Sequence, residues 1–328
     1  MVKNTIPALK QLRWHAIRVV KGMVFFMLII FAACNSKPDV AFLDYVEDPT
    51  LAKARQGFYD ALADNGFIKD STIYIDYLNA QGDQPTLLQA CQVLLAKKPK
   101  LIATNTTLAT VVTAQQNNYI PIFMMVAPRP DIAKLTDKAG KAPQNLFGIY
   151  ETLEYIDSSV SIIHTLMPQV KTLGLIYNQA EPQSVDAFNV VKQACEKNNI
   201  ELKSLPVTNS GETQLTTEAL INENIDAFFA LPDNVIFASF ETIVQSCDKH
   251  NIPVFTSEAG LVSRGAVASF GADFYQWGYQ SGLQAAHYLK TNKTKGLKPE
   301  IVKVRSKVYN PAQARKFNIT PGADFKPF

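Results

Sequence analysis

Several motifs that mark common enzyme classes are missing from this sequence. It has no G-x-S-x-G, no G-x-x-x-x-G-K-[ST] phosphate loop, no H-E-x-x-H and no C-x-x-C. The chain has only four histidines in 328 residues, and they are scattered along it. These absences argue against the serine-hydrolase, nucleotide-hydrolysing, zinc-protease and dithiol classes. We therefore expect no catalytic activity, no metal and no cofactor.

Acidic residues are absent from the first 33 positions, which hold five of the basic residues. The rest of the chain has 27 basic and 29 acidic residues, so its formal charge is −2 rather than the +3 of the whole sequence. Proteins that bind nucleic acid usually carry a clear excess of positive charge. Nucleic acid is therefore not an expected partner.

A long apolar run is also missing. The longest one, GMVFFMLIIFAA at residues 22–33, has 12 residues, whereas a permanent membrane-spanning helix needs about 20. A purely basic stretch precedes it and small residues end it, as in a secretory signal peptide. A buried core helix is the alternative, but the run has no polar face. We expect residues 1–33 to be a signal peptide.

Cysteine is scarce, with four in the chain. Cys34 could be a core thiol, half of a disulfide or a point of attachment. The segment Phe31–Cys34 resembles the processing site of bacterial lipoproteins, which implies acylation of Cys34 and a tether at residues 34–39. That resemblance implies an extracytoplasmic protein anchored to the cell membrane. The other three cysteines fall in helical windows and are expected as buried free thiols, with a Cys195–Cys247 bridge left open.

Short β-rich runs alternate with helical patterns from residue 39 onward, which predicts parallel sheets with crossover helices. The expected strands are 40–45, 72–78, 100–105, 120–126, 172–178, 200–207, 225–231, 252–257 and 266–270.

The sequence also repeats itself. Pro49 and Pro182 follow a strand in matching acidic loops, and two further blocks match at nearly the same offset of about 130 residues. Residues 40–126 and 173–258 are therefore two copies of one βαβαβαβ unit. The predicted fold class is α/β, with two similar doubly wound parallel-sheet lobes joined by a hinge.

We place the N-terminal lobe at 40–148 and the C-terminal lobe at 149–270, with 271–328 contributing to both. The expected hinge is the segment 147–151, and a second crossing is expected near 270–278. Ligands of open α/β sheets bind beyond the carboxyl ends of the strands. Two lobes that face each other would therefore hold a ligand in the cleft between them.

Five segments resemble the ABC transporter substrate-binding proteins, in particular the tryptophan/tyrosine-binding type. They are EDPTLAKARQGF (47–58), IYIDYLNAQGD (73–83), GLIYNQAEPQS (174–184), LPDN (231–234) and GAVASFGADFYQWG (265–278). The resemblance covers about residues 40–320.

This resemblance implies the periplasmic-binding-protein type I fold, which closes around a small solute by hinge bending. It also implies delivery of an amino acid, with an aromatic one as the candidate subclass, to an ABC permease by a monomeric protein. Two alternatives remain open: a sensor of the same fold that signals to a membrane receptor, and an enzyme that uses the cleft.

Candidate ligand-binding residues in the first lobe follow two of its strands. Asp44 and Tyr45 come after the first strand, and Asn105, Thr106 and Thr107 come between a strand and a helix. Hydroxyl groups and free N–H groups at a helix start suit a ligand carboxylate. A solvated acidic loop and an ordinary helix cap are the alternatives.

Candidates in the second lobe occupy the duplicated positions. Asp233 opens a helix and, by the resemblance, faces the ligand, so we expect it to bind an ammonium group, with Glu258 as a second acidic candidate. Phe237 is expected in the lobe core. The remaining candidates are Tyr150, as an aromatic wall in the hinge, and Tyr177, Asn178 and Asn234.

Overall fold

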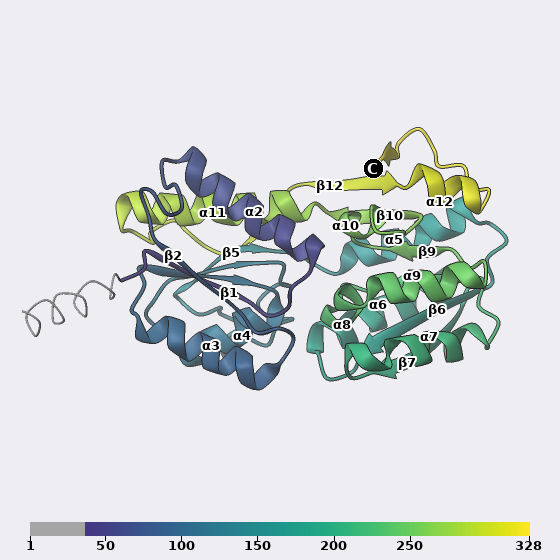
Figure 1. Cartoon of the computed structure of the whole chain (residues 1–328), viewed down its shortest axis with the longest axis horizontal. Coiled ribbons are helices and arrows are strands. Elements are labelled where there is room, and N and C mark those ends of the chain that lie inside the picture. The colour runs from purple at the N-terminus through teal and green to yellow at the C-terminus, as the bar shows by residue number, and fades with distance from the viewer. Residues whose placement is uncertain (1–36) are drawn as a thin grey trace, which may run out of the picture. The chain divides into compact units, whose positions relative to one another are not determined.

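The computed structural model describes residues 37–328, of which 38–328 form one compact unit. The signal peptide and the lipidation site predicted at Cys34 lie outside the described residues. Within the unit, two sheets define two lobes (Figure 1). No helix among the described residues is long and apolar enough to cross a membrane.

The first sheet has six strands in the order β11-β5-β4-β3-β1-β2, all parallel. Its strands are β1 (Val40–Asp44), β2 (Ile75–Asn79), β3 (Leu101–Asn105), β4 (Ile122–Met125), β5 (Leu146–Tyr150) and β11 (Glu300–Ile301). Its helices are α2 (Pro49–Asp64), α3 (Gln84–Ala96), α4 (Thr107–Gln116) and α11 (Phe274–Thr291).

The second sheet has seven strands in the order β13-β12-β10-β9-β8-β6-β7. Its strands are β6 (Thr172–Asn178), β7 (Glu201–Val207), β8 (Ala227–Ala230), β9 (Val254–Thr256), β10 (Ala268–Ala272), β12 (Arg305–Tyr309) and β13 (Lys326–Pro327). Its helices are α5 (Glu154–Leu166), α6 (Pro182–Lys197), the 3₁₀ turn η1 (Ser210–Glu212), α7 (Thr213–Ile221), α8 (Asn234–Ala238), α9 (Phe240–Lys249), α10 (Ala259–Val262) and α12 (Pro311–Lys316).

The strand orders confirm two similar doubly wound lobes. The order β4-β3-β1-β2 in the first sheet repeats as β9-β8-β6-β7 in the second. The β1 sequence VAFLD is buried at every position, as expected of a parallel strand with helices on both faces. One departure from the parallel pattern is β12, which pairs antiparallel with β10.

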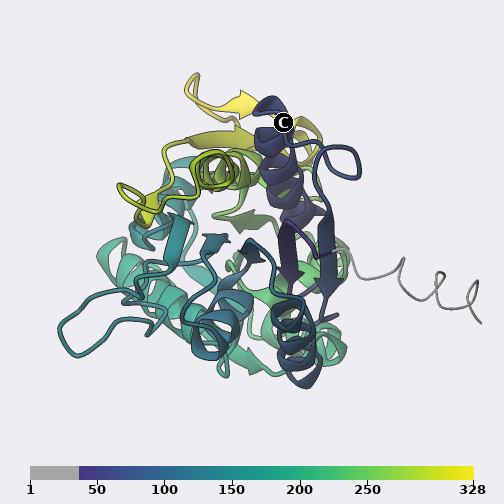
Figure 2. The same cartoon turned by 90° about the vertical axis from the view of Figure 1, so that its left-hand side faces the viewer.

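Helices cover both faces of each sheet. In the first lobe α2 and α11 lie side by side over one face, as both views show, and α3 and α4 cover the other (Figures 1 and 2). The two helices approach closely because a Cβ at Gly57 would overlap the backbone of Tyr275, and one at Gly278 would overlap that of Ala54. Glycine is therefore required at this contact.

The chain passes between the lobes three times rather than at the two places expected. It crosses after β5, between β10 and α11, and between β11 and β12. Because β5 pairs with β4, the first crossing begins after Tyr150, within the predicted hinge segment 147–151. The third crossing lies in the segment 271–328 that was expected to contribute to both lobes, but its position was not predicted, since β11 has only two residues and gives no period-two signal.

The two lobes also touch where α10 of the second lobe meets the start of α2 in the first. Arg264, which follows α10 in the second lobe, donates from Nη1 to Asp48 Oδ2 at 2.5 Å at the start of α2. Its Nε and Nη2 bind the Glu241 carboxylate at 2.7 and 2.8 Å. Gly260 of α10 packs directly against Thr50 of α2. The cleft is therefore closed in this structure.

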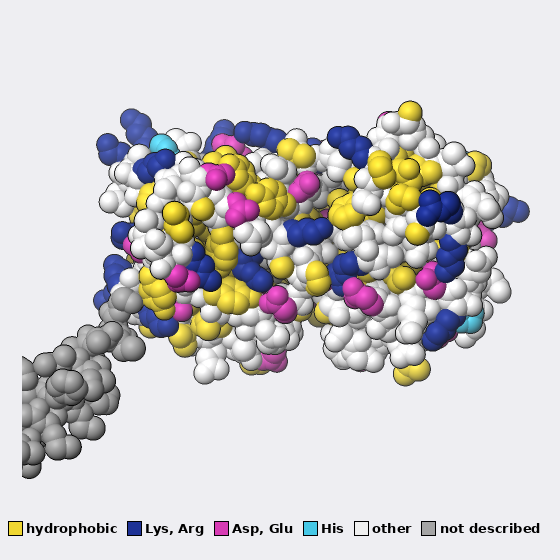
Figure 3. Space-filling view, turned by 45° about the horizontal axis from the view of Figure 1, so that its top comes forward, with side chains coloured by type: hydrophobic (Ala, Val, Ile, Leu, Met, Phe, Trp, Pro, Cys, Tyr) yellow, Lys and Arg dark blue, Asp and Glu magenta, His cyan; other side chains and the backbone are white. Residues whose placement is uncertain are grey.

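The surface charge agrees with the composition, which has no large excess of either sign after residue 33. On the face shown in Figure 3, basic and acidic side chains are interspersed rather than gathered by sign. Cys91, Cys195 and Cys247 are buried free thiols, as expected, and no disulfide joins Cys195 to Cys247.

Candidate functional site

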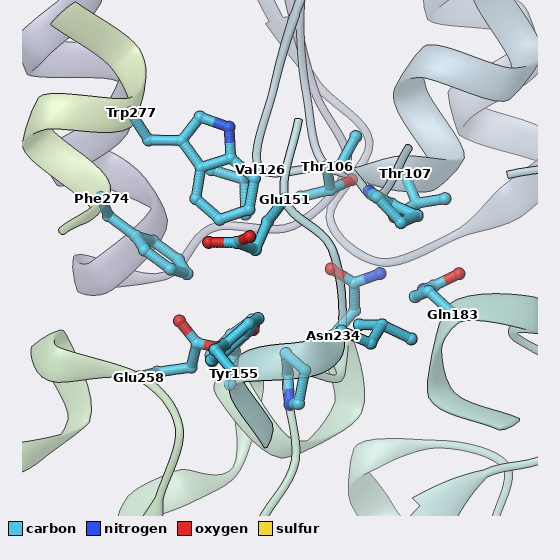
Figure 4. A pocket seen from close by; sticks show the side chains of 15 residues that line it. Thr106, Thr107, Val126, Glu151, Tyr155, Gln183, Asn234, Glu258, Phe274 and Trp277 are labelled. Carbon is cyan, nitrogen blue, oxygen red and sulfur yellow. The ribbon is translucent and has the colours of Figure 1, made fainter. Parts of the chain in front are cut away.

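A cavity lies between the lobes, at the carboxyl ends of strands from both sheets. The space within the lining atoms, open solvent included, is about 500 Å³. Figure 4 shows the lining side chains. They are Thr106, Thr107, Val126, Ala127, Pro128, Glu151, Leu153, Tyr155, Gln183, Pro232, Asn234, Phe237, Glu258, Phe274 and Trp277.

The first-lobe wall offers hydrogen-bond donors at the start of α4. Thr106 occupies the N-cap position with φ at +84°, and its side chain makes no capping hydrogen bond. Its Oγ1 is buried and without a partner among the described residues. The N–H groups of a first helical turn have no partner inside the helix and carry partial positive charge. Thr106 and Thr107 therefore form a wall suited to an anion.

The second-lobe wall presents hydrogen-bond acceptors, and Glu181 arranges them. The buried Glu181 carboxylate accepts from Asn234 Nδ2 at 2.8 Å, from Gln183 Nε2 and from Asn178 Nδ2 at 3.3 Å. Because the amide nitrogens are engaged there, the oxygens of Gln183 and Asn234 are left free for other partners. Gln183 Oε1 is buried and without a partner in the described part of the chain.

Glu181 itself lacks a neutralising cation. No Lys or Arg of the described residues forms an ion pair with it, and burial together with the nearby Asp233 raises the pKa of Glu181 to about 8. A cation on the adjacent wall would stabilise its ionised form.

Glu258 follows β9 and is the second acid without a cation. Its Oε1 accepts from Tyr155 Oη at 2.8 Å and from Ser257 Oγ at 3.1 Å. Its Oε2 is buried and has no partner within residues 37–328. Burial raises the pKa of Glu258 to about 8. One carboxyl oxygen is therefore left for a ligand.

Glu151, at the first crossing, differs from Glu181 and Glu258 because an arginine neutralises its charge. Arg305 donates to it from Nε at 2.8 Å and from Nη2 at 2.5 Å, in a bidentate pair. The first crossing is thereby tied to β12 of the second lobe. Glu151 lines the cavity as a paired carboxylate and leaves the local charge balanced.

Aromatic rings close the cavity near the crossings. Phe274 and Trp277 come from the first turn of α11, and their ring centroids are 5.6 Å apart in a T-shaped contact. Phe237 meets Phe274 at 5.9 Å, also edge to face. Trp277 Nε1 donates to Ile149 O at 2.8 Å, so the indole is held in place. This end of the cavity suits a flat apolar group.

The sequence model of the family described as ABC transporter substrate binding protein matches residues 39–323. The chain belongs to this family. Such substrate-binding proteins bind a small-molecule solute outside the cytoplasm and work with ABC permeases.

Relatives of this substrate-binding protein include a protein from Clostridioides difficile named a tyrosine-binding protein. The two are 31% identical over 256 residues, which is 78% of this chain and 74% of that protein. The match extends across both lobes.

Two solved structures are also similar. A conserved domain protein from Vibrio cholerae has a TM-score of 0.82 and 27% identity, over 89% of this chain and 99% of that one. A domain from Streptococcus pneumoniae in complex with L-Trp has a TM-score of 0.80 and 26% identity, over 88% and 97% of the two chains. Both support the periplasmic-binding-protein type I fold.

Four of the eleven residues predicted to bind ligand line the cavity of this substrate-binding protein. They are Thr106, Thr107, Asn234 and Glu258. Each directly follows a strand or begins the next helix, so the rule that ligands sit beyond strand ends led to them.

The other first-lobe candidates do not line the cavity. Asp44 binds Arg55 and accepts from Tyr77 Oη, and burial raises the pKa of Asp44 to about 6. Asn105 donates to the backbone of α2, and Tyr45 donates to Gly82 O at 2.7 Å. These side chains hold the first lobe together.

Among the second-lobe candidates, Asp233 caps α8 rather than facing the cavity. It accepts from Asn178 N at 2.8 Å, from Ser184 Oγ and from the backbone of α8. Tyr177 stacks on Phe188 at 4.5 Å. Asn178 binds Glu181, so it contacts the site indirectly.

Tyr150 packs at the end of β5 and is also absent from the lining. Phe237, expected in the lobe core, is buried but lines the cavity. Sequence reasoning did not select the remaining polar and aromatic lining residues. They are Glu151, Tyr155, Gln183, Phe274 and Trp277.

One signal could have identified Gln183. It is the second residue of α6, directly after the loop that duplicates the one before Pro49. By contrast, nothing in the local sequence distinguishes Phe274 and Trp277 from other apolar residues of a helix. No cluster of His, Cys, Asp or Glu suited to a metal occurs within the described residues.

Proposed function

We propose that this protein is the solute-binding component of an ABC importer for an amino acid with an aromatic side chain. It holds the amino acid in the cavity between its lobes, delivers it to a membrane permease and catalyses no reaction. The tyrosine-binding relative and the L-Trp-bound structure support an aromatic amino acid. The aromatic rings at one end of the cavity support it independently.

The observation that carries this proposal is the opposite chemistry of the two walls. The first-lobe wall at Thr106 and Thr107 offers donors, and the second-lobe wall at Gln183 and Asn234 offers acceptors backed by Glu181. A zwitterion needs both, because each of its charges must be matched when it leaves water. We propose that the first wall binds the α-carboxylate and the second the α-ammonium group.

Calorimetry with three related ligands tests this assignment. L-tryptophan should bind, whereas indole-3-propionate, which lacks the ammonium group, and tryptamine, which lacks the carboxylate, should each bind roughly 100-fold more weakly. Equal binding of either analogue would contradict the two-wall proposal. If no amino acid bound, the proposed solute class would be wrong.

We also propose that the mature protein is a monomer anchored through a lipid on Cys34. The basis is the FAAC sequence after a short apolar run. Cys34→Ser should release the protein from the membrane fraction or leave its precursor uncleaved, with ligand affinity unchanged. Normal processing and membrane retention of this variant would exclude the anchor.

A further inference from the structure

Glu258 and the first-lobe wall of Thr106 and Thr107 lie at different distances from the crossings between the lobes. Thr106 follows β3, whose counterpart in the second sheet is β8, and Asn234 begins the helix after β8. Glu258 follows β9, one strand nearer to the crossings than β8. In Figure 4, Glu258 stands with Tyr155 and Phe274, across the cavity from the two threonines.

The α-carboxylate and α-ammonium groups of an amino acid share one carbon atom, so they must bind close together. If the carboxylate lies at Thr106, the ammonium group falls at the neighbouring amide oxygens of Asn234 and Gln183. The side chain then extends toward the crossings, where Phe274 and Trp277 provide apolar contact. Glu258 is at that end of the cavity.

The free acceptor at Glu258 is rigidly held. Tyr155 and Ser257 both donate to Oε1, which leaves Oε2 buried and without a partner among the described residues. The unpartnered Oε2 among aromatic rings favours a ligand that brings a donor there, since a donor stabilises the ionised carboxylate, whereas an apolar ligand would leave the oxygen unsatisfied.

We propose that Glu258 determines specificity by accepting a hydrogen bond from the side chain of the ligand, a phenol O–H or an indole N–H. This inference rests on the proposed function, because it takes the ligand to be an aromatic amino acid. It assigns Glu258 to the side chain rather than to the ammonium group. L-tyrosine or L-tryptophan should therefore bind roughly 10- to 100-fold more tightly than L-phenylalanine.

The test is calorimetry of the purified full chain in detergent with L-tyrosine, L-tryptophan and L-phenylalanine. Glu258→Met keeps the side-chain length and removes the acceptor, so the preference over L-phenylalanine should vanish. Glu258→Gln keeps an acceptor oxygen without the charge and should retain part of the preference. The Gln variant also provides the test if the Met variant does not fold.

The outcomes separate this inference from the proposed function. If Glu258→Met and Glu258→Gln weaken all three amino acids equally and leave the preference unchanged, Glu258 binds the ammonium group and the inference is overturned. Equal binding of L-phenylalanine by the unmodified protein also overturns it, while amino-acid binding stands. If none of the three amino acids binds, the proposed function fails and the inference fails with it.

Discussion

Asp48 and Glu181 occupy the same position in the two copies of the repeat, each directly before the proline that begins a helix. Asp48 Oδ1 caps α2 by accepting from Thr50 N at 2.7 Å, and its Oδ2 binds Arg264 of the other lobe. Glu181 makes no side-chain cap and instead accepts from three side-chain amides of its own lobe.

Two residues further along each copy, the same difference between an inter-lobe contact and a contact within one lobe recurs. Thr50 packs against Gly260 across the lobe interface, whereas its counterpart Gln183 lines the cavity. One additional methylene lets Glu181 reach beyond its own helix start to the neighbouring amides. The duplicated loop therefore contacts the other lobe in one copy and lines the cavity in the other.

The largest effect is expected from Glu181→Gln. The change removes the charge behind the ammonium site and allows the amides of Gln183 and Asn234 to rotate, so affinity for the amino acid should fall roughly 100-fold. Calorimetry measures it, with thermal melting as the check on folding. An unchanged affinity would show that Glu181 does not arrange the acceptors.

A smaller effect is expected from Gly260→Ala. A Cβ at this position would overlap Thr50 Cγ2 only when the cleft is closed, so affinity should fall roughly 20-fold with little loss of stability. The double variant Gly260→Ala with Thr50→Ala removes the overlap and should recover most of the affinity. Absence of recovery would mean that this contact does not limit closure.

Asp48→Asn is the same chemical change as Glu181→Gln at the equivalent position. It weakens the ion pair with Arg264 and so favours the open form, which should lower the apparent affinity about tenfold. Small-angle X-ray scattering of the ligand-free protein should show a larger radius of gyration. A loss as large as that of Glu181→Gln would remove the distinction between the two positions.

The smallest effect concerns pH. Burial raises the pKa of both Glu181 and Glu258 to about 8 from an ordinary 4.5. Between those values the folded protein binds more protons than the unfolded chain, so the free energy of unfolding falls as pH rises. The melting temperature of the ligand-free protein should drop by a few degrees from about pH 5 to about pH 8.

The Gln variants at these two positions serve as the control for the pH series. Each should flatten the slope of melting temperature against pH, because its amide does not titrate. Asp48→Asn should leave the slope unchanged. A slope that persists in the variants at 181 and 258 would assign it to other groups.

Much of the fold could be predicted because strands of a parallel sheet are buried on both faces and read as apolar runs. The run at β6 (Thr172–Asn178) matched the predicted bounds, and β1 differed by one residue. The short strands β11 and β13 have two residues each, too few to show a period. Their position depends on contacts with distant strands.

Strand ends identified Thr106, Asn234 and Glu258, because that edge of the sheet follows from chain direction alone. The same rule also selected Asp44 and Asp233, which lie at strand ends. Asp44, however, is paired with Arg55, and Asp233 caps α8. Local sequence does not distinguish a free acid from a paired one when the partner comes from another element.

The sequence by itself determined the duplicated α/β architecture, since alternating apolar runs and a matched offset require only local periodicity. It also determined the family, through segments spread over both lobes. Only the tertiary structure decided which copy of each loop contacts the other lobe and which lines the cavity. That division depends on side chains such as Arg264 and Asn234, which meet their partners only after both lobes have folded and closed.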